Sequence, residues 1–232
     1  MFLKRFCIKK SFIRQGLFLA FPVLAFIGSV SFNVLNADEL KECKSEEDQE
    51  AGCIAKQYDE NGNLEIEVPY KNGKREGISK NYYENGNLWG ETPYKNGVIE
   101  GVGKTYYESG KLMEETPYKN GKRDGISKDY YENGNLWGET PYKNGKIDGI
   151  AKLYYENGNM LSEITYMNDE VHGSVKFYSK KLIWQANAQN GKLINGKCTN
   201  GKTLTDEHLA KINEDINEGN IDEDSWLEMC NN

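Results

Sequence analysis

The stretch from Tyr82 to Gly101, YYENGNLWGETPYKNGVIEG, decides the fold because it recurs along the chain with a period of 24 residues. Three glycine positions mark each copy. The first position is occupied by Gly62, Gly86, Gly110, Gly134 and Gly158. The second is occupied by Gly73, Gly97, Gly121 and Gly145, with Asp169 in the fifth copy, and the third by Gly77, Gly101, Gly125, Gly149 and Gly173. A fixed period of this size is typical of a repeat array, in which each unit packs mainly on its neighbours.

Each copy is predicted to be a β-hairpin, because Asn-Gly between runs that contain aromatic residues favours a tight turn. We expect two-residue type I′ turns at Asn61-Gly62, Asn85-Gly86, Asn133-Gly134 and Asn157-Gly158, with Ser109-Gly110 as a variant. For residues 96–99 we expect a four-residue loop, since that choice gives strands of equal length over 87–95 and 100–108.

This register predicts which residues face each other. It places Lys80 opposite Glu91, Tyr83 opposite Leu88, Tyr82 opposite Trp89, and Tyr94 between Gly77 and Gly101, where the glycines are expected to make room for the ring. Alternate residues point to opposite faces of a strand. One face is expected to carry Tyr83, Leu88, Tyr107, Leu112, Tyr131, Leu136, Tyr155 and Met160. The other is expected to carry Tyr82, Trp89, Tyr106, Met113, Tyr130, Trp137, Tyr154 and Leu161, together with a ladder of alternating Lys and Glu from Lys56 to Lys176.

Both ends of the array differ from its middle. Residues 38–53 are predicted to be a short, poorly ordered lead-in, and the first repeat starts directly at Cys53. The last hairpin, at about 174–196, has Lys180-Lys181 in place of Asn-Gly, as a worn capping copy would. Residues 197–232 are predicted to form a small helical cap, with one helix from Thr205 to Ile216 that Gly219 ends. A second helix over 222–230 would turn Trp226, Leu227 and Cys230 inward.

The N-terminal segment is predicted to direct export. Residues 1–15 hold Lys4, Arg5, Lys9, Lys10 and Arg14 and no acid, residues 16–35 are almost wholly apolar, and Ala37 precedes an acidic stretch. This pattern favours a signal peptide over residues 1–37, and hence a periplasmic or extracellular protein. The alternative is an uncleaved membrane anchor, because about 20 apolar residues can span a bilayer.

Charge and cysteines restrict the partners. The formal net charge is −7, and removal of residues 1–37 would make it more negative. That acidity disfavours nucleic acid and anionic membranes as partners.

The cysteines suggest disulfides. Cys7 lies in the predicted signal, which leaves four cysteines that allow three pairings. We favour Cys43–Cys53 and Cys198–Cys230, since each pair brackets one end of the array, and disulfides agree with export.

The pattern YYENGNL followed by PYKNGKREG resembles the bacterial variant of the MORN repeat (membrane occupation and recognition nexus), over about residues 54–196. The resemblance implies a mainly β fold, in which successive hairpins build an elongated single-layer antiparallel sheet. It also implies scaffolding, self-association and, in some members, lipid contact. Some bacterial members are labelled as antitoxins, although an export signal and disulfides fit a cytoplasmic antitoxin poorly.

No catalytic or metal-binding motif stands out. His172 and His208 lack a motif around them, and no nucleophile elbow, P-loop or H-E-x-x-H pattern occurs. Asp59, Asn61 and Asn63 resemble the start of a calcium loop, but Leu64 stands where that motif requires Gly. We therefore expect a protein that is not an enzyme and has no cofactor or metal.

The predicted binding surface is the aromatic stripe made by Tyr82, Trp89, Tyr106, Tyr130, Trp137 and Tyr154. A single-layer sheet leaves this stripe accessible, and Trp and Tyr are favoured in binding hot spots. The main hypothesis is a scaffold for a partner protein or for self-association. One alternative is a carbohydrate- or cell-wall-binding module, which requires exposed and roughly coplanar Trp89 and Trp137. Another is an enzyme with a pocket that contains His208 near Cys198–Cys230.

Overall fold

The computed structural model of the chain describes residues 40–179, 181–218 and 222–231. The expected signal peptide over 1–37 therefore lies outside the described residues, as do Lys180 and Gly219. Within the described part, no helix combines the length and apolarity needed to cross a bilayer.

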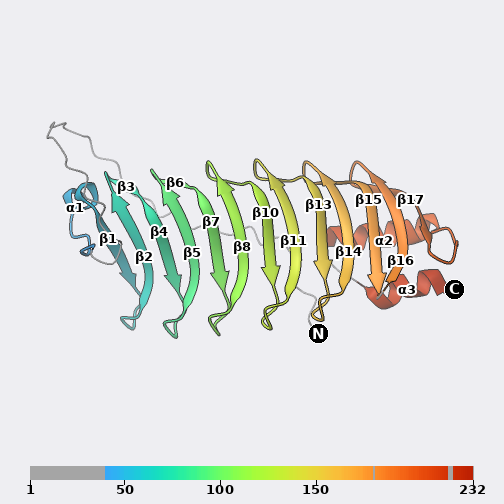
Figure 1. Ribbon diagram of the computed structural model, residues 1–232, viewed down its shortest axis with the longest axis horizontal. Helices are drawn as coiled ribbons and strands as arrows, with labels where there is room; N and C mark the ends of the chain where they lie inside the picture. Colours follow the sequence, from blue (N-terminus) through green and yellow to red (C-terminus); the bar gives the residue numbers. More distant parts are fainter. Residues whose placement is uncertain (1–39, 180, 219–221, 232) are drawn as a thin grey trace.

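The described residues form one open antiparallel sheet of 17 strands, which extends as an elongated single layer (Figure 1). The mainly β hairpin array predicted from the sequence is thereby confirmed. The hairpins begin with β1 (Cys53–Tyr58), β4 (Gly77–Tyr82), β7 (Gly101–Tyr106), β10 (Gly125–Tyr130) and β13 (Gly149–Tyr154). Their second strands are β2 (Leu64–Lys71), β5 (Leu88–Lys95), β8 (Leu112–Lys119), β11 (Leu136–Lys143) and β14 (Met160–Met167).

Short strands and a last group of longer ones complete the sheet. The two-residue strands β3 (Lys74–Arg75), β6 (Val98–Ile99), β9 (Lys122–Arg123) and β12 (Lys146–Ile147) follow the turns between copies. The array ends with β15 (Glu170–Ser179), β16 (Lys181–Gln189) and β17 (Lys192–Cys198). His172 lies in β15.

The turn at Asn85-Gly86 is not the predicted two-residue type I′ turn. The Tyr83 N–H donates to the Asn87 carbonyl at 2.8 Å, and the Gly86 N–H donates to the Tyr83 carbonyl at 2.9 Å. Of Asn85 and Gly86, only Gly86 has a positive φ, at 82°. The loop thus holds three residues, a type I turn followed by a left-handed glycine. The Asn85 Oδ1 accepts from the Asn87 N–H at 2.9 Å and helps to close it.

The extra loop residue changes the pairing beside it. Tyr82 lies opposite Leu88 across a bulge, so the predicted pairs of Tyr83 with Leu88 and of Tyr82 with Trp89 are wrong. Beyond the bulge the predicted register is correct, with Lys80 opposite Glu91 and Gly77 opposite Tyr94.

The predicted four-residue loop at 96–99 is also wrong. Asn96 and Gly97 have φ values of 51° and 81°, and Tyr94 lies opposite Ile99, which defines a two-residue type I′ turn. The chain then bulges at Glu100, whose N–H donates to the Pro93 carbonyl at 3.1 Å.

The bulge shifts the pairing between β5 and the following strand by two residues. This shift offsets the shorter turn, so Glu91 pairs with Lys104, as predicted. The third glycine of each copy sits here. Gly101 has a φ of 117°, and an added Cβ would lie 3.3 Å from the Pro93 ring. Glycine is therefore needed here because the bulge requires a positive φ and because a side chain would press against the Pro93 ring. The prediction that it makes room for Tyr94 is wrong.

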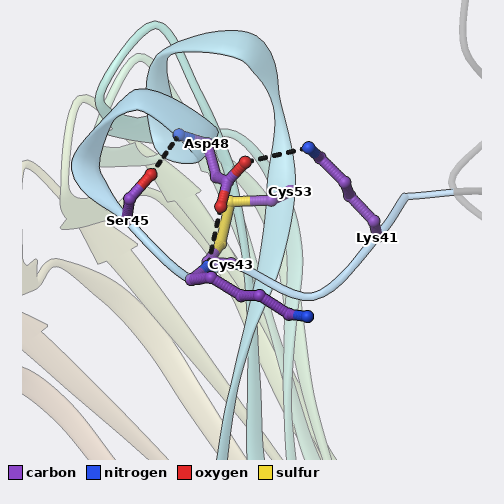
Figure 2. A network of polar contacts seen from close by, with 6 residues as sticks. Lys41, Cys43, Ser45, Asp48 and Cys53 are labelled. Atoms are coloured by element: carbon purple, nitrogen blue, oxygen red, sulfur yellow. Dashed lines mark hydrogen bonds and ion pairs between the residues drawn. A yellow bond between two sulfur atoms is a disulfide. The ribbon is translucent and has the colours of Figure 1, made fainter.

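The N-terminal lead-in is an ordered cap and not a loose segment. Helix α1 (Glu46–Ala51) begins at Ser45, whose Oγ accepts from the Asp48 N–H at 3.2 Å. Figure 2 shows the Asp48 carboxylate between the Lys41 ammonium, at 2.9 Å, and the Lys44 N–H, at 2.9 Å. These bonds lower the pKa of Asp48, the Lys41 contact most of all. The disulfide Cys43–Cys53 joins the cap to β1.

Helix α1 replaces the repeat that would precede the first one. In later copies the turn glycine donates to the preceding copy, as Gly97 N–H does to the Arg75 carbonyl at 2.9 Å. At the first turn the Asn72 and Gly73 N–H groups donate instead to the Glu50 and Gln49 carbonyls of α1, at 3.1 and 3.2 Å. Carbonyls of α1 thus satisfy the backbone donors of the first turn, as the preceding copy does at the later turns.

The C-terminal end holds most of the apolar core. Helices α2 (Asp206–Glu218) and α3 (Glu223–Asn231) lie over one face of the last strands (Figure 1), and Cys198–Cys230 links α3 to β17. Trp226 packs edge-on against Phe177 and Trp184, with ring centroids 5.1 and 5.5 Å apart. Trp226 and Cys230 are buried as predicted, whereas Met229 is buried in place of Leu227, which is half-buried.

Candidate functional site

One face of the sheet, which we call the ladder face, carries the alternating Lys and Glu predicted from the sequence. Each Glu lies opposite a Lys on both neighbouring strands, as Glu91 does with Lys80 and Lys104. The same pattern runs from Lys56 opposite Glu67 to Lys176 opposite Glu163, and both of these pairs are ion pairs of 3.1 Å. Partly exposed pairs of this kind each contribute well under about 1 kcal/mol, so the ladder mainly fixes register.

The tyrosines of the predicted binding stripe have internal partners that sequence reasoning missed. Each hydroxyl donates to the glutamate one repeat earlier, from Tyr82 to Glu67 at 2.7 Å through Tyr106, Tyr130, Tyr154 and Tyr178. Burial, followed by the glutamate, raises the pKa of Tyr106 and Tyr130 to about 12, so both remain protonated donors. These rings are half-buried, and they bind the repeats together as well as forming the surface.

Exposed apolar side chains also line the ladder face. Trp89 is 44% exposed, whereas Trp137 is half-buried. A second row, which the sequence analysis did not single out, consists of Ile78, Val102, Ile126 and Ile150, exposed by 50, 48, 54 and 52%. Each of these residues lies two positions before a lysine of the ladder, as Ile78 does before Lys80, and this spacing could have predicted that they share its face. The face thus presents an apolar row on one side of a charged ladder and aromatic rings on the other.

The opposite face, which we call the capped face, is covered at its last strands by α2 and α3. Register places Gly138, Leu153, Ser162, Phe177, Trp184 and Cys198 in one row across this face. Asp215 of α2 is 1% exposed and accepts from the Trp226 indole at 2.9 Å and from the Lys211 ammonium. That carboxylate joins the two helices.

A pair of acids on the capped face was also missed. Glu114 of β8 lies directly opposite Asp129 of β10, in a row that Thr105 and Gly138 extend. Thr116 and Ser127 hydroxyls contact the Glu114 carboxylate. Burial, followed by repulsion from Glu114, raises the pKa of Asp129 to about 7, while Arg123 acts in the opposite direction. Neither the composition nor the repeat pattern indicates this pair, because other copies carry Asn81 or Leu153 at the position of Asp129.

The residues considered for catalysis and metal binding are engaged in local structure. His208 lies in the first turn of α2, where its N–H donates to the Thr205 Oγ1 at 3.2 Å, so that Thr205 caps the helix. A hollow beside Cys198 is lined by Gln185, Lys197, Cys198, Thr199 and Gly201, without a His or an acid. The Asp59 carboxylate accepts from the Asn61 and Asn63 N–H groups, both at 2.8 Å, and so closes its turn. Among the described residues, no group of three or more His, Cys, Asp or Glu is placed to hold a metal.

The repeats match a known family. The family model described as MORN repeat variant matches residues 54–72, 75–96, 99–120, 123–144 and 147–168. The matches cover five consecutive copies and stop before the hairpin of β16 and β17. No curated protein matches the chain significantly.

Proposed function

Residues 54–168 belong to the MORN repeat variant family, and from this premise we propose that the protein is a non-enzymatic, exported scaffold whose ladder face binds a partner protein. MORN repeats are associated with binding, and the family is generally non-catalytic. The observation that carries the proposal is that half-exposed Ile78, Val102, Ile126 and Ile150, with Trp89 across the ladder from them, lie on an open sheet. Extended apolar surface of this kind on a soluble protein marks an interaction site.

The ladder face suits a protein partner because apolar rows flank a charged ladder. The apolar rows supply buried area, while the Lys and Glu side chains select the orientation of a complementary surface. The Tyr-to-Glu hydrogen bonds hold the rings in place before binding, which lowers the entropy lost on association. Export is supported by the disulfides Cys43–Cys53 and Cys198–Cys230, since such bonds persist in oxidising compartments.

The test compares capture of partners from a cell-envelope extract by the wild type and by a Trp89→Ala, Trp137→Ala double variant. Loss of two hot-spot rings is expected to weaken binding by about 30-fold or more. Ile194→Ala is the matched control, because Ile194 is 55% exposed on β17, outside the repeats. If the double variant retains every partner, including a second copy, the ladder face is not the binding surface. Competition by a soluble polysaccharide would instead identify a carbohydrate-binding module.

A further inference from the structure

Apart from the Lys–Glu ladder, exposed lysines and exposed glutamates of the array gather mainly at opposite long rims. We define the basic rim by the exposed lysines that flank the type I′ turns, which are Lys71, Lys74, Lys95, Lys119, Lys122, Lys143 and Lys146. The acidic rim is formed by exposed glutamates in the three-residue loops at the other end of the hairpins, Glu60, Glu84, Glu108, Glu132 and Glu156, with Lys111 as the exception. The net negative charge of the chain therefore conceals a strongly basic edge.

The basic rim places like charges directly against each other. Lys71 lies opposite Lys74, Lys119 opposite Lys122, and Lys143 opposite Lys146. Like charges at facing positions destabilise a hairpin. The fold does not require them, because the equivalent pair in the next copy is Lys95 opposite Val98. Lysine pairs that destabilise the hairpin and are not needed for folding are typical of a binding surface.

The acids nearest to the basic rim accept hydrogen bonds from backbone N–H groups of the turns of that rim and make no ion pair with its lysines among the described residues. Glu76 accepts from the Asn96 N–H at 2.6 Å, Glu100 from the Asn120 N–H at 2.6 Å, and Asp124 from the Asn144 N–H at 3.0 Å. Each of these carboxylates links one turn to the next. Within the described residues, the ion pairs are made by lysines away from this rim, Lys41, Lys56, Lys128, Lys176 and Lys211.

The chain itself shows an acidic segment against the first basic turn. Helix α1, with Glu46, Glu47 and Asp48 in its first turn, lies beside β3 (Figure 1). Its Glu50 and Gln49 backbone carbonyls accept from the Asn72 and Gly73 N–H groups. It covers the first turn alone and leaves the basic turns of the following copies open. Those basic turns recur in the second, third and fourth copies, and the glutamates of the acidic rim recur in all five.

We propose that the basic rim of one molecule binds the acidic rim of a second copy, so that molecules associate side by side. Lysines flank the type I′ turns of the first four copies, and a glutamate lies in each three-residue loop, so lysines of one molecule meet glutamates of the other at the same 24-residue spacing. The contact joins two different surfaces and leaves one rim free at each end, which produces open chains of molecules and not closed dimers. Exposed ion pairs are weak and screened by salt, so the association is weak and requires low ionic strength. It is separate from binding at the ladder face.

The test measures sedimentation of the purified protein at about 0.05 M and about 1 M salt. The wild-type protein is expected to associate only at the lower salt concentration. One variant reverses the basic rim with Lys119→Glu, Lys122→Glu, Lys143→Glu and Lys146→Glu. The other reverses the acidic rim with Glu84→Lys, Glu108→Lys and Glu132→Lys. Each variant alone is expected to remain monomeric at low salt, and an equimolar mixture of the two is expected to associate again.

The mixture separates binding from folding, because a misfolded variant would not recover association. The basic-rim variant also keeps each cross-strand pair like-charged, which matches its hairpin stability to that of wild type. Lys44→Glu with Lys197→Glu changes net charge away from the rims and is expected to leave association intact. Trp89→Ala with Trp137→Ala is expected to leave it intact too, which distinguishes rim contact from ladder-face binding. A monomeric wild type at low salt, association of either variant alone, or a mixture that stays monomeric would each overturn the proposal.

Discussion

Asp129 makes the stability of the array depend on pH. Its ordinary pKa is 3.8 and its pKa in the fold is about 7, because it is half-buried opposite Glu114. Between these values the folded chain holds a proton that the unfolded chain has lost. Stability therefore falls as the pH rises from about 4 to about 7 and changes no further above that range. Arg123, which also stacks over Tyr142, lessens the effect without removing it.

Asp129→Asn is expected to stabilise the protein by on the order of 1–2 kcal/mol at about pH 8 and by less than half of that at about pH 5. Asparagine suits the position, since Asn81 occupies it in an earlier copy. Urea unfolding at both pH values measures the change. Glu132→Gln is the control, because Glu132 is exposed in the same copy. A variant with the same pH dependence as wild type would show that Asp129 is ionised throughout this range.

At the scale of the element, the hairpins show what a sequence pattern can and cannot determine. The period and the central register were predictable, because Lys80 and Glu91 pair only if the strands lie as they do. The turns were not, because Asn-Gly occurs at both ends of each hairpin, as Asn85-Gly86 and as Asn96-Gly97. A dipeptide cannot decide between a two-residue and a three-residue loop when side-chain bonds such as that of Asn85 compete. The Tyr-to-Glu bonds depend on the resulting bulge and were missed with it.

The two turns are expected to respond differently to serine. Asn96 has a φ of 51°, a conformation that costs residues other than glycine, asparagine and aspartate about 1–2 kcal/mol. Asn96→Ser should therefore destabilise the hairpin by about 1 kcal/mol. Asn85→Ser should have an effect within about 0.5 kcal/mol, since Ser109 occupies the same place and Gly110 N–H still donates to the Tyr107 carbonyl at 2.8 Å. Urea unfolding compares them, and equal losses would contradict the difference between the turns.

At the scale of the whole molecule, the sheet is uneven along its length. Apart from Cys53 and Pro69, the buried apolar side chains among the described residues begin at Leu153 and continue to Cys230. The earlier copies are held by ladder pairs, Tyr-to-Glu bonds and the α1 cap. A repeat motif predicts equal units, so it could not predict this asymmetry, which comes from the helices and from Phe177, Trp184 and Trp226 outside the motif. The acid pair of Glu114 and Asp129 could not be predicted from the motif either, because other copies carry different residues at these two positions.

The asymmetry predicts that the array unfolds from its N-terminal end. Because each copy contacts mainly its neighbours, loss of one end spreads only over adjacent copies. Cys43→Ser with Cys53→Ser should therefore lower hydrogen-exchange protection in β1, β2 and β4 and leave β14–β16 unchanged. The matched variant, Cys198→Ser with Cys230→Ser, should lower protection in β16, β17 and α3 and leave β4 and β5 unchanged. Native-state hydrogen exchange measures both, and a uniform loss of protection in either variant would show that the sheet unfolds as one cooperative unit.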